Sequence, residues 1–175
     1  MKQKKLPIAQ SIIIVTLFLL QFLVVPAISV NGICPNLIMV YIIFFAIYKP
    51  GNSSIVLAFF ASLVYSVVFG GPIGMFSLVV VIVVFVVNKI VTAMGEKPLL
   101  FYLFLAIFSV LAEELFYGIL LLIFGFQTDF FACVFLIALP SFVYDLIALL
   151  ILMPIVRIFI KPKQIEEQPQ PVDIV

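Results

Sequence analysis

Six apolar runs alternate with short gaps, and basic residues occur in every second gap. Basic residues next to membrane spans stay on the cytoplasmic side. The pattern therefore predicts six spans with both termini cytoplasmic, and Asp129 becomes the only charged residue of an outer loop. All nine Lys and Arg residues then lie on one side: Lys2, Lys4, Lys5, Lys49, Lys89, Lys97, Arg157, Lys161 and Lys163.

Composition excludes several classes of protein. The chain is 66% hydrophobic and 10% charged, with a mean hydropathy of +1.43, so lipid must be the solvent for most of it. A net charge of +1 with dispersed basic residues argues against nucleic-acid binding. Histidine is absent, which removes His-based metal sites and Ser-His or Cys-His nucleophile pairs. We therefore expect that the protein is not an enzyme and that it has no catalytic residues, no cofactor and no resident metal.

The expected fold is an all-α polytopic bundle in the inner membrane. One six-helix transmembrane domain covers residues 1–160, and residues 161–175 are expected to form a disordered cytoplasmic tail rich in Pro, Glu and Gln. Two of the spans are unusual in length or composition: the second is short, and the sixth contains Pro140 and Pro154 as kink points. The predicted spans are 8–28, 36–48, 55–69, 75–94, 99–124 and 130–157.

The second span has about 13 residues, or roughly 20 Å as a helix, against a hydrocarbon core of about 30 Å. Three solutions remain open from the sequence. The span can recruit Cys34 and Pro35 at its start, thin the bilayer locally, or be shielded by neighbouring helices.

Small residues recur on one stripe of several spans, which favours close helix packing in lipid. Such stripes predict that the spans form one compact bundle. They comprise Ser54, Ala58, Ser62, Ser66 and Gly70 on the third span, Ala106, Glu114 and Gly118 on the fifth, and Ala138, Ser141, Asp145 and Ala148 on the sixth.

Three acids fall inside predicted spans, where ionisable groups are costly and are functional candidates. Glu113 lies about 21 Å from the cytoplasmic start of its helix and Asp145 about 18 Å from Arg157, so they share a depth on consecutive antiparallel helices. Glu114 and Asp145 also lie on the small-residue stripes. Glu113 is rotated by about 100° from its stripe and could point at a partner or at lipid.

Two interpretations of these acids remain open. They form a carboxylate pair that binds a cation, transfers a proton or grips a partner helix, or they form a protonated, hydrogen-bonded pair that fixes interhelix register. Two carboxyls so close in a dry setting would not both ionise. Cys34 and Cys133 are both predicted near the outer side, where a disulfide is possible, but packing as two small buried apolar groups is favoured.

Several short motifs follow one another in a distinctive order along the chain. An outer turn, in which Gly70, Gly71, Pro72 and Gly74 surround Ile73, is the most specific of them, although a tight turn is also the simple structural explanation of these residues. The other motifs are Cys34-Pro35-Asn36, Tyr48-Lys49-Pro50-Gly51, Ser66 to Phe69, and Leu139-Pro140-Ser141 followed by Asp145, Pro154 and Arg157. In this order the chain resembles the MreD family of rod shape-determining membrane proteins, over about residues 10 to 160.

The chain departs from the family pattern at three polar positions. The family often has Asp where Asn36 and Ser66 stand, and Asn where Asp145 stands. Together with the turn and with Glu113 and Glu114, these residues are our candidates for partner binding or helix packing.

The resemblance implies a non-enzymatic role in cell-wall elongation. It implies binding to MreC, regulation of RodA and its class B penicillin-binding protein, and indirect alignment with MreB filaments. It also implies a bundle similar to the S component of energy-coupling-factor transporters. The rival class is therefore a substrate-binding transporter component, although Asn31, Gln127, Thr128 and Asp129 would give its outer loops few polar ligand groups.

Overall fold

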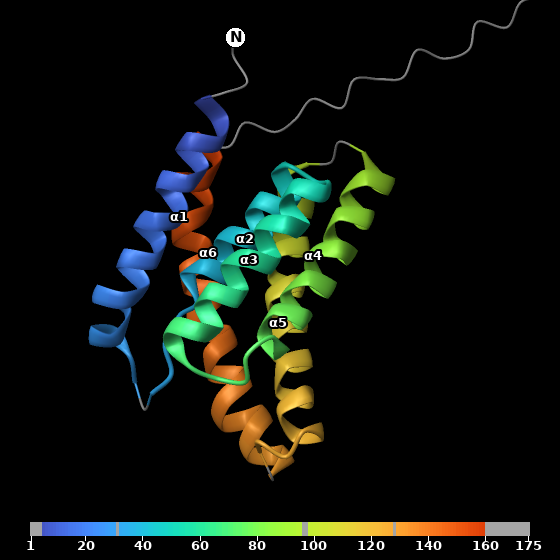
Figure 1. Cartoon of the computed structure of the whole chain (residues 1–175). Coiled ribbons are helices and arrows are strands. Elements are labelled where there is room, and N and C mark those ends of the chain that lie inside the picture. Colours follow the sequence, from blue (N-terminus) through green and yellow to red (C-terminus); the bar gives the residue numbers. More distant parts are fainter. Residues whose placement is uncertain (1–4, 31, 96–97, 128, 160–175) are drawn as a thin grey trace, which may run out of the picture.

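The computed structural model describes residues 5–30, 32–95, 98–127 and 129–159, with side chains placed within 12–156. The described part is all helical apart from its turns and one isolated bridge between Val30 and Ile33. The predicted tail 161–175 and the Arg157 side chain lie outside the described residues. The elements are α1 (Lys5–Leu23), a 3-10 turn η1 (Val25–Ile28), α2 (Leu37–Tyr48), α3 (Asn52–Phe69), α4 (Met75–Met94), α5 (Leu99–Ile123), a π-helical segment η2 (Ala132–Ala138) and α6 (Leu139–Phe159) (Figure 1).

Consecutive helices run in opposite directions, and α1 begins at the same end of the bundle at which α6 ends (Figure 1). That end also holds the C-terminal ends of α2 and α4, near which Lys49 and Lys89 lie. The opposite end holds the turn 70–74 and the connection that contains Asp129. The described basic side chains thus gather at one end of the bundle, as the alternating gaps predict.

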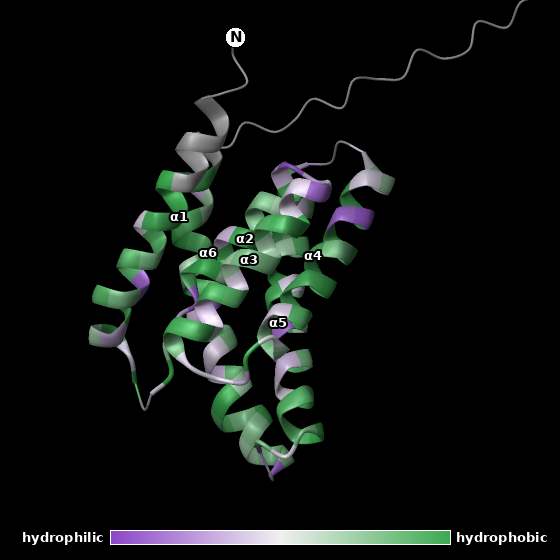
Figure 2. Ribbon diagram, in the orientation of Figure 1, coloured by the Kyte–Doolittle hydropathy of each residue, from purple (hydrophilic) through white to green (hydrophobic). Residues whose placement is uncertain are grey.

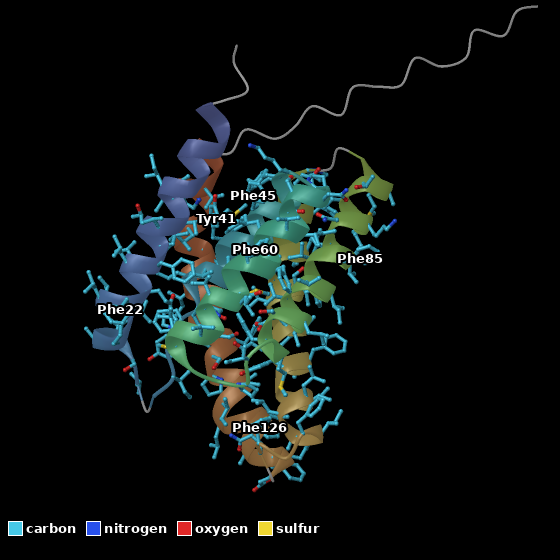
Figure 3. The ribbon with its side chains drawn as sticks, viewed as in Figure 1. Phe22, Tyr41, Phe45, Phe60, Phe85 and Phe126 are labelled. Carbon is cyan, nitrogen blue, oxygen red and sulfur yellow. The ribbon has the colours of Figure 1, made fainter. Side chains whose placement is uncertain are left out.

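Within the described residues, four helices are long and apolar enough to cross a membrane: α3, α4, α5, and η2 joined to α6. The described part of α1 (Ile12–Leu23) and the whole of α2 are shorter apolar helices. Hydrophobic residues make up most of each described helix (Figure 2). Large apolar side chains are also exposed on the surface of the bundle, which therefore suits lipid contact. Of the side chains labelled in Figure 3, Phe22, Phe60, Phe85 and Phe126 are exposed, whereas Tyr41 and Phe45 are buried.

The short helix α2 forms the centre of the bundle. Every residue from Ile38 to Tyr48 is buried, and α2 contacts α1, α3, α4, α5 and α6. A helix that is apolar on all sides suits either a protein core or a lipid environment, and α2 is enclosed by protein. Of the three solutions that the sequence leaves open, the structure adopts shielding by neighbouring helices.

The small-residue stripe of α3 packs inward as predicted. Ser54, Ala58, Ser62 and Ser66 are buried, whereas Gly70 is exposed in the turn that follows. Small side chains let the α3 backbone approach its neighbours α2 and α4 closely. The stripe of α6 also faces the protein, because Ala138, Asp145 and Ala148 are buried.

The sixth predicted span begins with the π-helical turn η2, and the α-helix follows from Leu139. Pro140 lies just after this change of helix type. Proline has no N–H to donate and its ring clashes with the carbonyl four residues earlier, so the wider π turn accommodates it. Pro154 lies inside α6, which continues to Phe159.

Candidate functional site

The site is built around the N-terminus of α2, which begins inside the bundle rather than at its surface. The first N–H groups of a helix have no partner within the helix, and in lipid each needs another acceptor. Asn36 is the N-cap residue, and its side-chain oxygen accepts a hydrogen bond from the Met39 N–H at 3.0 Å. Its own backbone N–H donates to Oδ1 of Asp145 on α6 at 2.5 Å.

Gln21 of α1 completes this cap. Its Oε1 accepts from the Leu37 N–H at 2.9 Å, and its Nε2 donates to the Pro35 carbonyl at 2.9 Å. The Gln21 side chain is 1% exposed. The buried start of α2 is therefore held by polar side chains of α1 and α6.

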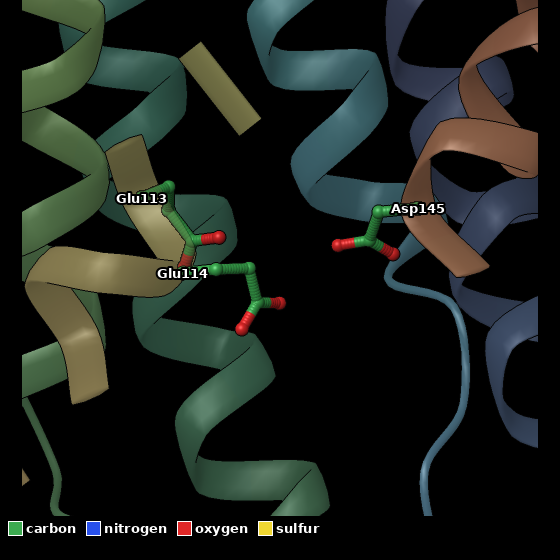
Figure 4. A group of neighbouring side chains, drawn as sticks. All are labelled: Glu113, Glu114 and Asp145. Carbon is green, nitrogen blue, oxygen red and sulfur yellow. The ribbon is translucent and has the colours of Figure 1, made fainter. Parts of the chain in front are cut away.

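Asp145 also faces two acids of α5 (Figure 4). One carboxylate oxygen from each of Glu113, Glu114 and Asp145 lies within 4.8 Å of the others. Glu113 is 2% exposed and Asp145 1%, while Glu114 is partly exposed. The prediction that Glu113 and Asp145 share a depth on antiparallel helices is confirmed by this contact.

The position of Glu113 corrects one alternative from the sequence. Glu113 does not point at lipid or at a partner, because it is buried on the same face of α5 as Ala106 and Val110. Residues at i, i+4 and i+7 share a helix face. The face of α5 that packs on the bundle therefore includes Ala106, Val110 and Glu113, and is wider than the stripe through Glu114. Both glutamates consequently reach Asp145.

The carboxyl oxygens are only partly satisfied. Within the described residues, Glu113 Oε2 and Asp145 Oδ2 are buried and receive no hydrogen bond. One carboxyl oxygen of Glu114 lies within 4.8 Å of one of Asp145, and two ionised carboxylates so close in a dry setting repel each other. Either a proton or a cation is therefore needed to bring these acids together.

A cavity of about 210 Å³ is lined by two of the three acids, Glu113 and Glu114. It extends from Glu113 and Glu114 toward Phe69, Gly70 and Leu121, and so toward the end of the bundle with the turn 70–74. Polar groups form much of its wall, and space of this size admits water. The lining residues with polar side chains are Cys34, Asn36, Tyr65, Ser66, Glu113, Glu114, Tyr117, Cys133 and Ser141.

The other candidate residues divide between this cavity and the outer turn. Ser66 is buried and its hydroxyl donates to the Ser62 carbonyl at 2.9 Å. Gly70 and Gly71 are exposed, and Pro72 and Gly74 are partly buried. Gly71 has φ 115°, and a Cβ there would lie 3.2 Å from the Tyr117 hydroxyl, so a side chain would both strain the turn and press on α5.

Both cysteines line the cavity as free thiols, so the favoured expectation of unpaired, packed cysteines is confirmed for Cys133, which is buried, and in part for Cys34, which is half-buried. Cys34 belongs to the connection before α2. Burial, and to a smaller extent the nearby Asp145 carboxyl, raises the pKa of the Cys34 thiol.

Two polar groups that organise the bundle are not among the residues singled out from the sequence. Gln21 caps α2, and Asn88 of α4 binds α3 near the opposite end, donating to the Ser54 hydroxyl at 2.9 Å and to the Gly51 carbonyl at 3.2 Å. The available signal was the presence of an amide side chain within an apolar span, because such groups usually hydrogen-bond across helices.

These features define a polytopic α-helical membrane protein with a cluster of acids inside its bundle. The chain matches the family described as rod shape-determining protein MreD over residues 2–163, nearly its whole length. It therefore belongs to the MreD family, as its motifs indicate, and is a rod shape-determining membrane protein. No curated protein and no solved structure matches the chain.

Proposed function

We propose that this protein is a non-enzymatic component of the bacterial cell-elongation complex. In this role it binds MreC and regulates RodA and its class B penicillin-binding protein, with MreB aligned indirectly beneath the membrane. The family match over residues 2–163 is the observation that carries the proposal. The proposed location is the inner membrane, with six spans and both termini cytoplasmic, and the basic residues of alternate gaps support that orientation.

The distribution of polar groups suggests how partners are met. Glu113, Asp145, Asn36 and Ser66 are buried within the chain, so we propose that they act in helix packing and in shaping the cavity. The turn 70–74 is exposed at the outer end, where a partner can reach it. Ile73 in this turn is 73% exposed, which makes it a candidate anchor.

The test is affinity purification of the tagged full chain from its native membranes in mild detergent, with mass spectrometry of the recovered proteins. Recovery of MreC or of the elongation synthases is the expected result. The Ile73→Ser variant should lower that recovery. Ile123→Ser is the matched control, because Ile123 is 70% exposed at the same end of the bundle and lies outside the turn. Absence of every elongation protein from the wild-type sample would refute the proposal.

The cavity at the outer end favours one second candidate, a substrate-binding component similar to the S component of energy-coupling-factor transporters. With this second function, as with the first, the six helices would adopt a fold similar to that of the S component. The same purification separates the two candidates. Recovery of ATP-binding cassette subunits with their transmembrane coupler, in place of elongation proteins, would establish the transporter function.

A further inference from the structure

We propose that Glu113, Glu114 and Asp145 form a calcium-binding site at the inner end of the cavity. An acidic cluster alone does not define such a site. Here two of its oxygens, Glu113 Oε2 and Asp145 Oδ2, belong to side chains that are 2% and 1% exposed and receive no hydrogen bond within the described residues. These oxygens are desolvated but unused, which is the state of a ligand group that awaits a cation.

The arrangement of the acids favours Ca²⁺ over Mg²⁺. One oxygen from each residue lies within 4.8 Å of the other two, so the three carboxylates converge on one place. Mg²⁺ demands near-ideal octahedral geometry, keeps several waters and is usually bound by one or two carboxylates, whereas Ca²⁺ accepts flexible geometry and six to eight oxygen ligands. Three carboxylates held by two packed helices therefore suit Ca²⁺ better than Mg²⁺.

The composition of the cluster selects the class of ion. All three ligands are carboxylate oxygens, which suit hard cations, and the chain has no histidine for the metals that prefer nitrogen. Ca²⁺ takes six to eight oxygen ligands, and its site can include water. The adjoining cavity of about 210 Å³ has room for several waters to complete the shell.

The surrounding charges favour a cation in this place. Lys49 is at the far end of α2 from Asn36, about 20 Å along the helix, so it does not neutralise the acids. The N-terminus of α2 contributes a partial positive charge beside Asp145, but this offsets only a part of one of the three carboxylate charges. A divalent cation would offset two of the three carboxylate charges and would replace a proton that otherwise has to reduce the repulsion among these acids.

The first test uses terbium, a luminescent substitute for Ca²⁺, with the purified wild-type protein in detergent. The chain contains no Trp, so emission excited through the protein must come through tyrosine. Tyr65 and Tyr117 line the cavity beside the acids. We expect tyrosine-sensitised terbium emission that Ca²⁺ displaces at least ten-fold more effectively than Mg²⁺. Tyr117→Phe should weaken the emission and leave Ca²⁺ affinity within two-fold of wild type.

The second test measures binding of radioactive Ca²⁺ by equilibrium dialysis. One ion per chain should bind with a dissociation constant below about 1 mM, within the range of protein calcium sites. Glu114→Gln and Asp145→Asn should each weaken binding at least ten-fold. Asp129→Asn is the matched control, because Asp129 is an exposed acid that caps the next helical segment through the Phe131 N–H, and it should bind as the wild type does.

The outcomes that overturn the proposal are distinct from failure of a variant to fold. Absence of saturable Ca²⁺ binding by the wild type, or Mg²⁺ competing as well as Ca²⁺, overturns it without any substitution. Unchanged binding in Glu114→Gln and Asp145→Asn overturns it as well, as does an equal loss in Asp129→Asn. The wild-type terbium signal supports the site even if the carboxamide variants unfold.

Discussion

The capping of α2 by Gln21 gives a sharp prediction for the stability of the bundle. In Gln21→Leu, a side chain of similar size cannot accept from the Leu37 N–H or donate to the Pro35 carbonyl. The Leu37 N–H and the Pro35 carbonyl then remain inside the bundle without the hydrogen bonds that Gln21 provides. Among the described α-helices, α2 is the one that the α1 backbone approaches. The Gln21 hydrogen bonds therefore also attach α1 to the rest of the protein.

The magnitude follows from the two orphaned groups. Each unsatisfied buried backbone group costs about 1–3 kcal/mol. In membranes the cost falls toward the lower limit, because the unfolded chain within the bilayer also finds partners, and measured polar contacts average about 0.6 kcal/mol. We therefore expect Gln21→Leu to lower the free energy of unfolding by about 2 kcal/mol, near the sum of two groups at the lower limit.

The assay is unfolding by SDS in mixed micelles, followed by far-ultraviolet circular dichroism. Thr16→Val is the matched control, because Thr16 lies on the same helix, is exposed, and hydrogen-bonds only to the Ile12 carbonyl one turn before it. The control should change stability by less than about 0.5 kcal/mol, as surface substitutions usually do. A loss in Gln21→Leu no larger than that of the control would refute the capping argument.

Four further predictions concern other parts of the molecule. Asp145→Asn should cost less than about 1 kcal/mol of unfolding free energy, because an amide oxygen still accepts from the start of α2, whereas Asp145→Leu should cost about 2 kcal/mol or more in the same SDS titration. Gly118→Leu should destabilise by about 1–3 kcal/mol through overpacking, since even a Cβ at Gly118 lies 3.3 Å from a thiol of η2, and Gly118→Ala should cost less. Maleimide labelling of Cys34 at neutral pH should be slower than labelling of a small-molecule thiol in water, because the raised pKa of Cys34 leaves less thiolate. The labelling rate should keep rising with pH beyond the range in which ordinary thiols titrate, and a rate that levels off early would contradict this. In a chain without its native cysteines, Asp129→Cys should react with an impermeant maleimide added outside the cell and Lys89→Cys only after permeabilisation, and the reverse result would invert the topology.

Much of the architecture is predictable from the sequence. The apolar runs give the helices to within a few residues at most ends, and the basic gaps give their alternating order. Small residues at every fourth position identify the buried face of α3. The depths of Glu113 and Asp145 follow from counting residues along two antiparallel helices, which is why their contact is predictable.

The tertiary structure alone decided the rest. Lipid and a protein core are both apolar, so hydrophobic periodicity does not show which face of a membrane helix meets protein. The burial of α2 on all sides, the inward direction of Glu113 and the use of Gln21 as a cap are consequences of which helices are neighbours. A sequence states which polar groups lie at membrane depth. Only the packing of α1, α5 and α6 around α2 determines that Gln21 and Asp145 bind the start of α2 while Glu113 and Glu114 line the cavity.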